Sequence, residues 1–209
     1  MALVKLNNRG VRSATTFGSI SALGEMRFIK KLTASSDSEL SFVDGTDDVV
    51  LDDTYKEYLF TFHNMHPDNN APQFSFQGNA SGGSGYNETI TSTAFKAYHY
   101  EADTLAELGY TTARDQAQGT AFQDLTSYGV SDGNDSGLSG YLHLFNPSNT
   151  TFVKHFISRV CSAYDSADPI PTDSYCSGYF NTTSAIDEIQ FKFSSGNIDA
   201  GDICLYGIN

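Results

Sequence analysis

The residues that could bind a metal ion are few and sit in loop-like sequence. His63 and His66 are three positions apart, and Asp68 is the nearest candidate for a third ligand. A protein zinc site needs at least three such ligands. The segment 132–135 (DGND) offers oxygen atoms of the kind that bind calcium, but it lacks the full EF-hand pattern. We therefore interpret these residues as loop residues and expect no metal site and no cofactor.

Motifs for nucleophilic or acid–base catalysis are equally weak. The sequence contains no G-x-S-x-G motif, and no cysteine lies in a recognised catalytic context. Adjacent carboxylates occur at Asp47/Asp48 and Asp52/Asp53, and glycoside hydrolysis uses two carboxylates across a sugar site. With 25 acidic residues such pairs arise by chance, so they are best explained as solvated turn residues. We expect that the protein is not an enzyme.

Tyrosines provide a possible sugar-binding surface. Exposed aromatic rings form sugar platforms, and this chain has 12 Tyr but no Trp. The other interpretation places the same tyrosines at strand ends or at protein interfaces, where amphipathic rings are common. The candidates are Tyr86, Tyr98, Tyr100, Tyr128, Tyr141 and Tyr179.

The elements that must position these residues are β-strands. Short runs rich in aromatic and β-branched residues alternate with Gly, Asn, Asp and Ser turns, which is typical of strands. In 55–63, for example, Tyr58, Phe60 and Phe62 fall on one face. The pattern predicts an all-β fold, an antiparallel β-sandwich that is jelly-roll-like. The expected strands are 26–32, 38–43, 55–63, 73–77, 88–93, 95–100, 140–145, 152–160, 175–181, 188–194 and 203–207.

Other segments depart from this pattern. Residues 102–108 and 113–122 could each form a short helix, and 127–139 is the best candidate for a long mobile loop or an insertion. Residues 1–24 show no period and are predicted to be an extended N-terminal arm before a single domain, 25–209. Three widely spaced cysteines suggest no disulfide framework, and Cys204 is expected to be buried.

Charge is distributed unevenly along the chain. The net charge is −13, yet residues 1–31 hold six Lys and Arg against Glu25 alone. An acidic protein is a poor nucleic-acid binder, and no run of about 18 apolar residues predicts a membrane span. No apolar stretch near the N-terminus predicts a secretory signal. A basic arm on an acidic body predicts docking on an acidic neighbour. The expected contact residues are Lys5, Arg9, Arg12, Phe17, Ile20 and Leu23.

Two terminal segments carry a family resemblance. The resemblance is carried by residues 5–24 (KLNNRGVRSATTFGSISALG) and 193–208 (FSSGNIDAGDICLYGI). Residues 144–148 and 178–186 add to the match. Together they resemble small proteins encoded by marine tailed bacteriophages, including those of cyanobacteria. The resemblance implies a virion structural protein made in the host bacterial cytoplasm. The chain departs most from the pattern over 105–139.

These observations predict a non-enzymatic capsid decoration, or cement, protein that binds the major capsid protein or other virion proteins. A homotrimer is expected because closed symmetry is the rule for homo-oligomers. The closing strand, 203–208, is expected to end a sheet or to pair across subunits. The alternative is a tail-associated or fibre protein that binds host surface glycans through its tyrosines and the 127–139 loop. A depolymerase that uses paired carboxylates is a third hypothesis.

Overall fold

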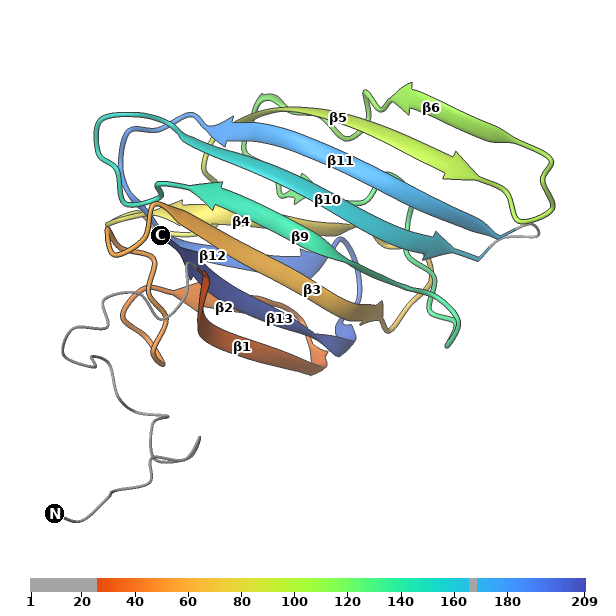
Figure 1. The fold of residues 1–209 in the computed structure, drawn as a ribbon, viewed down its shortest axis with the longest axis horizontal. Coiled ribbons are helices and arrows are strands. Elements are labelled where there is room, and N and C mark those ends of the chain that lie inside the picture. Colours follow the sequence, from red (N-terminus) through yellow and green to blue (C-terminus); the bar gives the residue numbers. More distant parts are fainter. Residues whose placement is uncertain (1–25, 166–168) are drawn as a thin grey trace, which may run out of the picture.

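The computed structural model describes residues 26–165 and 169–209, and these form two antiparallel β-sheets packed face to face (Figure 1). The larger sheet has the order β1 (Met26–Asp37), β13 (Ile198–Ile208), β3 (Glu57–Pro67), β9 (Gly137–Phe145), β10 (Lys154–Tyr164), β11 (Ile170–Phe180), β5 (Ile90–His99) and β6 (Ala106–Tyr110). The short β7 (Ala117–Gly119) also pairs with β5. The smaller sheet has the order β2 (Leu40–Val43), β12 (Ile186–Phe193), β4 (Phe74–Ala80) and β8 (Gln123–Asp124).

The prediction of an all-β antiparallel sandwich is confirmed, and each predicted strand overlaps an observed one. The two runs 88–93 and 95–100 prove to be the single strand β5, because Ala94 is buried and continues the alternation without a turn. Sequential neighbours β9, β10 and β11 form a meander in the larger sheet. The jelly-roll refinement of the fold stays a prediction.

The last two strands lie inside the sheets. β13 is hydrogen-bonded to both β1 and β3, so that Leu205 is in register with Lys30 on one side and Phe60 on the other. In the same way β12 lies between β2 and β4. The expectation that 203–208 ends a sheet or pairs across subunits is wrong, because this strand already has a partner on each side.

A cluster of phenylalanines joins the two sheets. Phe191 on β12 is fully buried, and five other rings surround it with centroid separations between 5.2 and 6.3 Å. Alternation along each strand sends these rings to the same interior, because successive side chains point to opposite faces. The surrounding rings are Phe42, Phe60, Phe62, Phe74 and Phe76.

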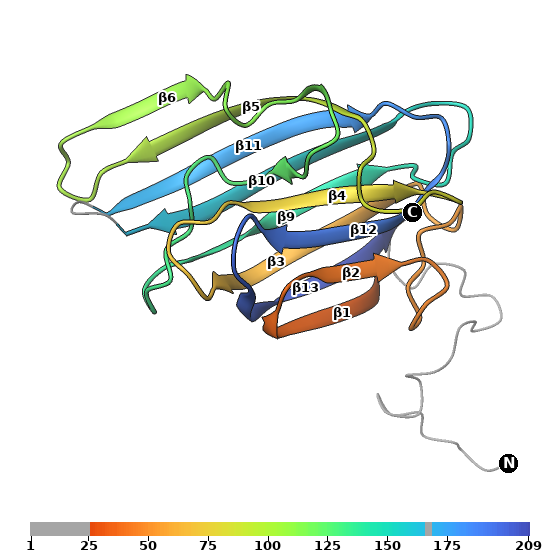
Figure 2. The ribbon, with the colours of Figure 1, turned by 180° about the vertical axis from the view of Figure 1, so that it is seen from behind.

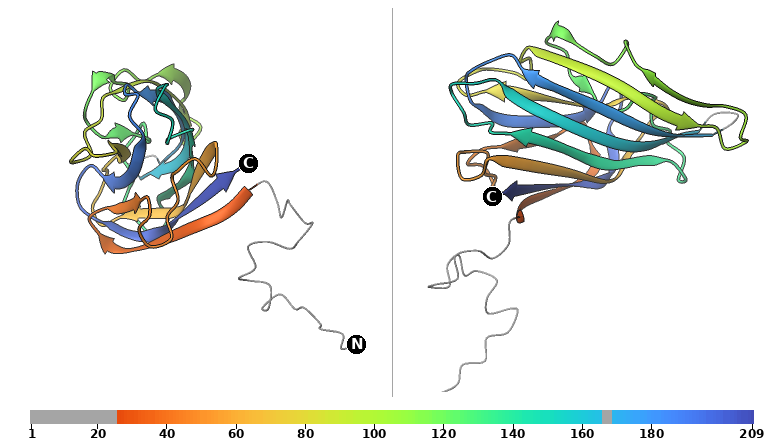
Figure 3. Two further views of the ribbon diagram at one scale, coloured as in Figure 1. Left: turned by 90° about the vertical axis from the view of Figure 1, so that its left-hand side faces the viewer. Right: turned by 45° about the horizontal axis from the view of Figure 1, so that its top comes forward.

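The sheets differ in width, so loops complete the interior. Figure 2 shows the smaller sheet in front of the larger one, and the end view in Figure 3 shows the larger sheet curving around it. The first part of 127–139 is not the mobile loop expected from the sequence, because Ser127 and Val130 are buried. The amide of Ser127 donates to Ser174 Oγ at 2.9 Å, and the Val130 carbonyl accepts from Ala71 N at 2.9 Å.

No helix occurs in the described part of the chain, so the helices expected at 102–108 and 113–122 are wrong. The first segment joins the sheet as β6, which pairs with β5. In the second, side-chain amides bind carbonyls that a helix would use internally. Gln123 Nε2 donates to Arg114 O at 2.7 Å, and Gln77 Nε2 donates to Ala121 O at 2.9 Å. Tertiary hydrogen bonds thus override a weak local preference.

We predict that Phe191→Ala lowers the free energy of unfolding by about 3–5 kcal/mol, because it opens a cavity where the two sheets meet. Chemical denaturation measures the loss. Phe152→Ala is the matched control, since Phe152 is 69% exposed, and it should change stability by less than about 0.5 kcal/mol. Equal losses for the two variants would contradict this description of the core.

Candidate functional site

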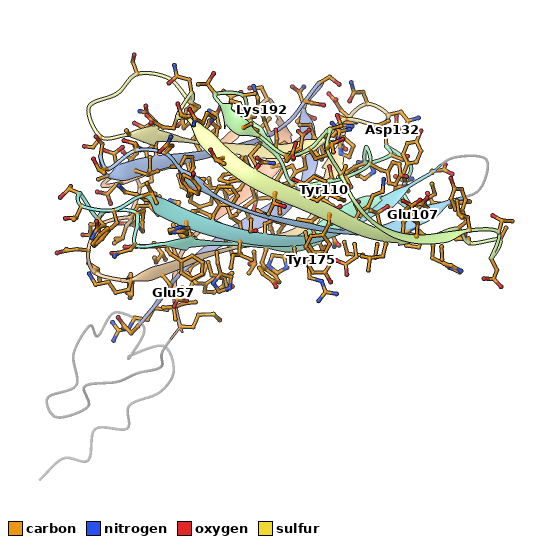
Figure 4. The ribbon with its side chains drawn as sticks, turned by 90° about the horizontal axis from the view of Figure 1, so that it is seen from above. Glu57, Glu107, Tyr110, Asp132, Tyr175 and Lys192 are labelled. Atoms are coloured by element: carbon orange, nitrogen blue, oxygen red, sulfur yellow. The ribbon has the colours of Figure 1, made fainter. Side chains whose placement is uncertain are left out.

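The outer face of the larger sheet carries a row of aromatic side chains around one arginine. Five adjacent strands each contribute one residue in direct register: β9, β10, β11, β5 and β6. We call these residues the aromatic row: Tyr141, Arg159, Tyr175, Phe95 and Tyr110. In Figure 4 Tyr175 lies on the outer side of the larger sheet, while Lys192 lies on the opposite side of the sandwich.

Tyr175 contacts its neighbour in the aromatic row on each side. The rings of Phe95 and Tyr175 stack with centroids 4.6 Å apart and an interplanar angle of 5°. On the other side of Tyr175, the Arg159 guanidinium carbon lies 5.0 Å from the ring centroid, which is a cation–π distance. Phe95 is 41% exposed and Tyr110 is 55% exposed. Aromatic rings that are held rigid by a sheet and left open to solvent mark a binding surface.

Asp173 fixes the two central members of the row. Arg159 donates to both carboxylate oxygens, with Nε–Oδ1 at 3.0 Å and Nη2–Oδ2 at 2.6 Å. The Tyr175 hydroxyl donates to Asp173 Oδ2 at 3.0 Å. The hydrogen bonds from Arg159 hold the pKa of Asp173 below its ordinary value, and the hydrogen bond to Asp173 raises the pKa of Tyr175. The charge of Arg159 is therefore already neutralised by Asp173 before any partner binds.

A shallow depression of about 570 Å³ lies beside the aromatic row. Its floor is at Ser177, whose small side chain is in register with Ile157 on β10 and Thr93 on β5. His155 and Tyr179 line it, with ring centroids 5.8 Å apart. A mostly apolar hollow with a few polar groups at its rim accommodates an apolar side chain or the face of a sugar ring.

The structure places the six candidate tyrosines in different parts of the molecule. Tyr141 belongs to the aromatic row and Tyr179 lines the depression. Tyr98 is buried at one end of the sandwich, with its ring centroid 5.9 Å from Tyr100 and 5.6 Å from Tyr128. Tyr86 lies 6.5 Å from the Phe122 ring. The structure therefore does not bring the six tyrosines into a single platform.

Sequence reasoning missed most of the aromatic row, namely Arg159, Tyr175, Phe95 and Tyr110. The sequence carries no clear signal for them, because exposed Ile157 and buried Ser158 break the polar–apolar alternation of β10. The six predicted contact residues of the arm (Lys5, Arg9, Arg12, Phe17, Ile20 and Leu23) lie outside the described residues.

The candidate metal and carboxylate residues have local partners. His63 Nε2 lies 2.8 Å from Thr61 Oγ1, and His66 Nε2 lies 3.0 Å from Gly133 O. Hydrogen bonds from the Thr54 side chain and then from the Thr54 amide lower the pKa of the Asp52 carboxylate. Within 26–165 and 169–209, no three His, Cys, Asp or Glu side chains are grouped so that they could hold a metal ion. The same residues include no helix long and apolar enough to span a membrane.

We predict that Asp173 titrates below 3.8, so that its contribution to stability is complete above that pH and is lost as the pH falls through its lowered pKa. NMR titration of the side-chain carboxyl measures this value. In Asp173→Asn the Tyr175 hydroxyl loses its charged acceptor, so its pKa should fall toward 10.0. An Asp173 pKa at or above the ordinary value, or an unchanged Tyr175 pKa in the variant, would contradict the assigned network.

The chain was compared with family models, curated proteins and solved structures, and no match was found in any of the three. The likeness of the terminal segments to marine phage proteins therefore stays a prediction.

Proposed function

We propose that the protein is a non-enzymatic structural protein of a phage particle, and specifically a capsid decoration protein. The observation that carries this proposal is the aromatic row, which offers a rigid and partly apolar docking surface on the larger sheet. The assignment to a phage particle rests on the resemblance of 5–24 and 193–208 to marine phage proteins. The expected site of synthesis is the host bacterial cytoplasm, and the expected final location is the virion.

The composition of the aromatic row suits a protein partner. Tyrosine and arginine are enriched among the residues that dominate binding energies at protein interfaces. Arg159 is already paired with Asp173, so a partner that covers it does not leave an isolated buried charge. The strand backbone holds all five side chains in place, which reduces the conformational entropy lost on docking.

The basic arm supplies a second contact in this proposal. Arg9 and Arg12 would pair with acidic groups on the major capsid protein or another virion protein, while Phe17, Ile20 and Leu23 would be buried against it. A small β-sandwich with two separate contacts gains avidity, because the second contact forms within an already tethered complex. A homotrimer at a capsid symmetry axis would multiply this gain.

We predict that Tyr175→Ala combined with Phe95→Ala weakens binding to particles that lack the protein by on the order of tenfold or more, since these stacked rings are central to the proposed surface. Co-sedimentation with such particles measures the affinity.

Deletion of 1–24 should abolish binding while the sandwich stays folded. Phe152→Ala, which changes an equally apolar ring outside the row, should bind normally. Undiminished binding by the double variant and by the truncated protein would contradict the proposal.

The depression at Ser177 favours one alternative, a tail-associated or fibre protein that binds host surface glycans. Its aromatic and imidazole walls could stack on a sugar ring, while Thr93 and Ser177 offer hydroxyl groups to sugar hydroxyls. A glycan array probed with the wild-type protein and with Ser177→Arg, which fills the depression, tests this function. Binding that the substitution removes would support it, and absence of binding with or without divalent ions would count against it.

A further inference from the structure

The larger sheet has two open edges. β1 stands at one end of the strand order and β6 at the other, and within the described part of the chain no strand pairs along their outer sides. The backbone N–H and C=O groups on the outer side of an edge strand form a template for another strand. Figure 1 shows the two edges on opposite sides of the molecule, so one copy could use both at the same time.

The strand directions at these edges suit a junction between copies. Every neighbouring pair from β1 to β6 is antiparallel, and the order β1-β13-β3-β9-β10-β11-β5-β6 contains an even number of strands. β1 and β6 therefore run in opposite directions. If β6 of one copy lies beside β1 of the next, in head-to-tail order, the new pair is again antiparallel and the outer faces stay on the same side.

The two edges also carry opposite charge. Along β1, Arg27, Lys30 and Lys31 precede the first acid, which is Asp37 at the end of the strand. The segment 101–115, which contains β6, holds four acids and one cation. Both edges also have partners within the chain, since Arg114 is paired with Asp124 at 2.9 Å and Lys31 with Asp202 at 3.1 Å, so the contrast between the edges is one of net formal charge. The four acids are Glu101, Asp103, Glu107 and Asp115.

Apolar side chains lie at both edges on the outer face. Phe28 on β1 is 59% exposed and is in register with Tyr206, whose ring lies 5.7 Å away. Leu108 on β6 is 74% exposed, and Tyr110 in the aromatic row is 55% exposed. Because a shared sheet keeps these side chains on one face, pairing of β6 with β1 would bring them together across the junction.

We propose that copies of this chain associate head to tail, with β6 of one copy extending the larger sheet of the next along its β1. A contact of this kind forms a closed ring when the rotation between copies permits it, and an open chain otherwise. Lysines and a bulge between Phe28 and Lys30 protect β1 from pairing with strands of other proteins. The acidic segment 101–115 complements these lysines, so β1 would pair selectively with β6 of another copy. The inference does not depend on which particle or surface the assembly binds.

A charge-exchange experiment on the full chain tests this contact. One variant reverses the β1 edge, Arg27→Glu with Lys30→Glu, which leaves the Lys31–Asp202 pair intact, and the other reverses the β6 edge, Glu101→Lys with Asp103→Lys, which leaves the hydrogen bond from Tyr98 to Glu107 intact. Each variant alone should dissociate, with a dissociation constant raised on the order of tenfold or more, because like charges then face each other. Mixed together, the two should form assemblies with an even number of chains in which the variants alternate, since each reversed edge meets its complement only on the other variant. Native mass spectrometry reads the assemblies as multiples of the 22.7 kDa chain.

Reassembly of the mixture also excludes misfolding as the cause of dissociation. Asp53→Lys is the control for a charge reversal outside both edge strands, because Asp53 is an exposed acid in the connection between β2 and β3, and it should leave assembly intact. Leu108→Asp, at a highly exposed position, should weaken assembly without unfolding the chain. A monomeric wild-type protein, or an oligomer that survives both reversals, would overturn the proposal.

Discussion

The fold depends on burying the inner face of a nine-stranded sheet against a four-stranded one. Phe191 is at the centre of this contact, and its neighbours come from both sheets. β12 can place this ring only because it lies between β2 and β4, while β13 ties the first strand to the third. The first and last strands of the described chain are thereby paired through contacts far apart in the sequence, and such contacts slow folding.

The unequal width of the sheets has consequences elsewhere in the molecule. Loops such as 125–131 complete the interior, and the side chains of Gln77 and Gln123 hold the connection that runs from β6 back to the smaller sheet. The outer face of the larger sheet has no cover in the described structure, so the aromatic row is left exposed there. Its two edges are open as well. The candidate contact surfaces thus follow from how the core is built.

The strand pattern and the core could be predicted from local alternation. Tyr58, Phe60 and Phe62 were expected on one face, and all three are buried. The aromatic row could not be predicted in the same way, because Arg159 and Tyr175 become neighbours only through strand register. The Ala, Leu and Glu residues of 102–108 suggested a helix, yet an open edge of β5 offered backbone partners that a short helix could not match.

The measurement that tests the central claim most directly is a cryo-EM reconstruction of the assembly that carries this chain. The account predicts density of a neighbouring molecule over the aromatic row and a continuous sheet across the β6–β1 junction. Copies that contact their neighbours only through the outer face of the smaller sheet, with the aromatic row and both edges open to solvent, would contradict it.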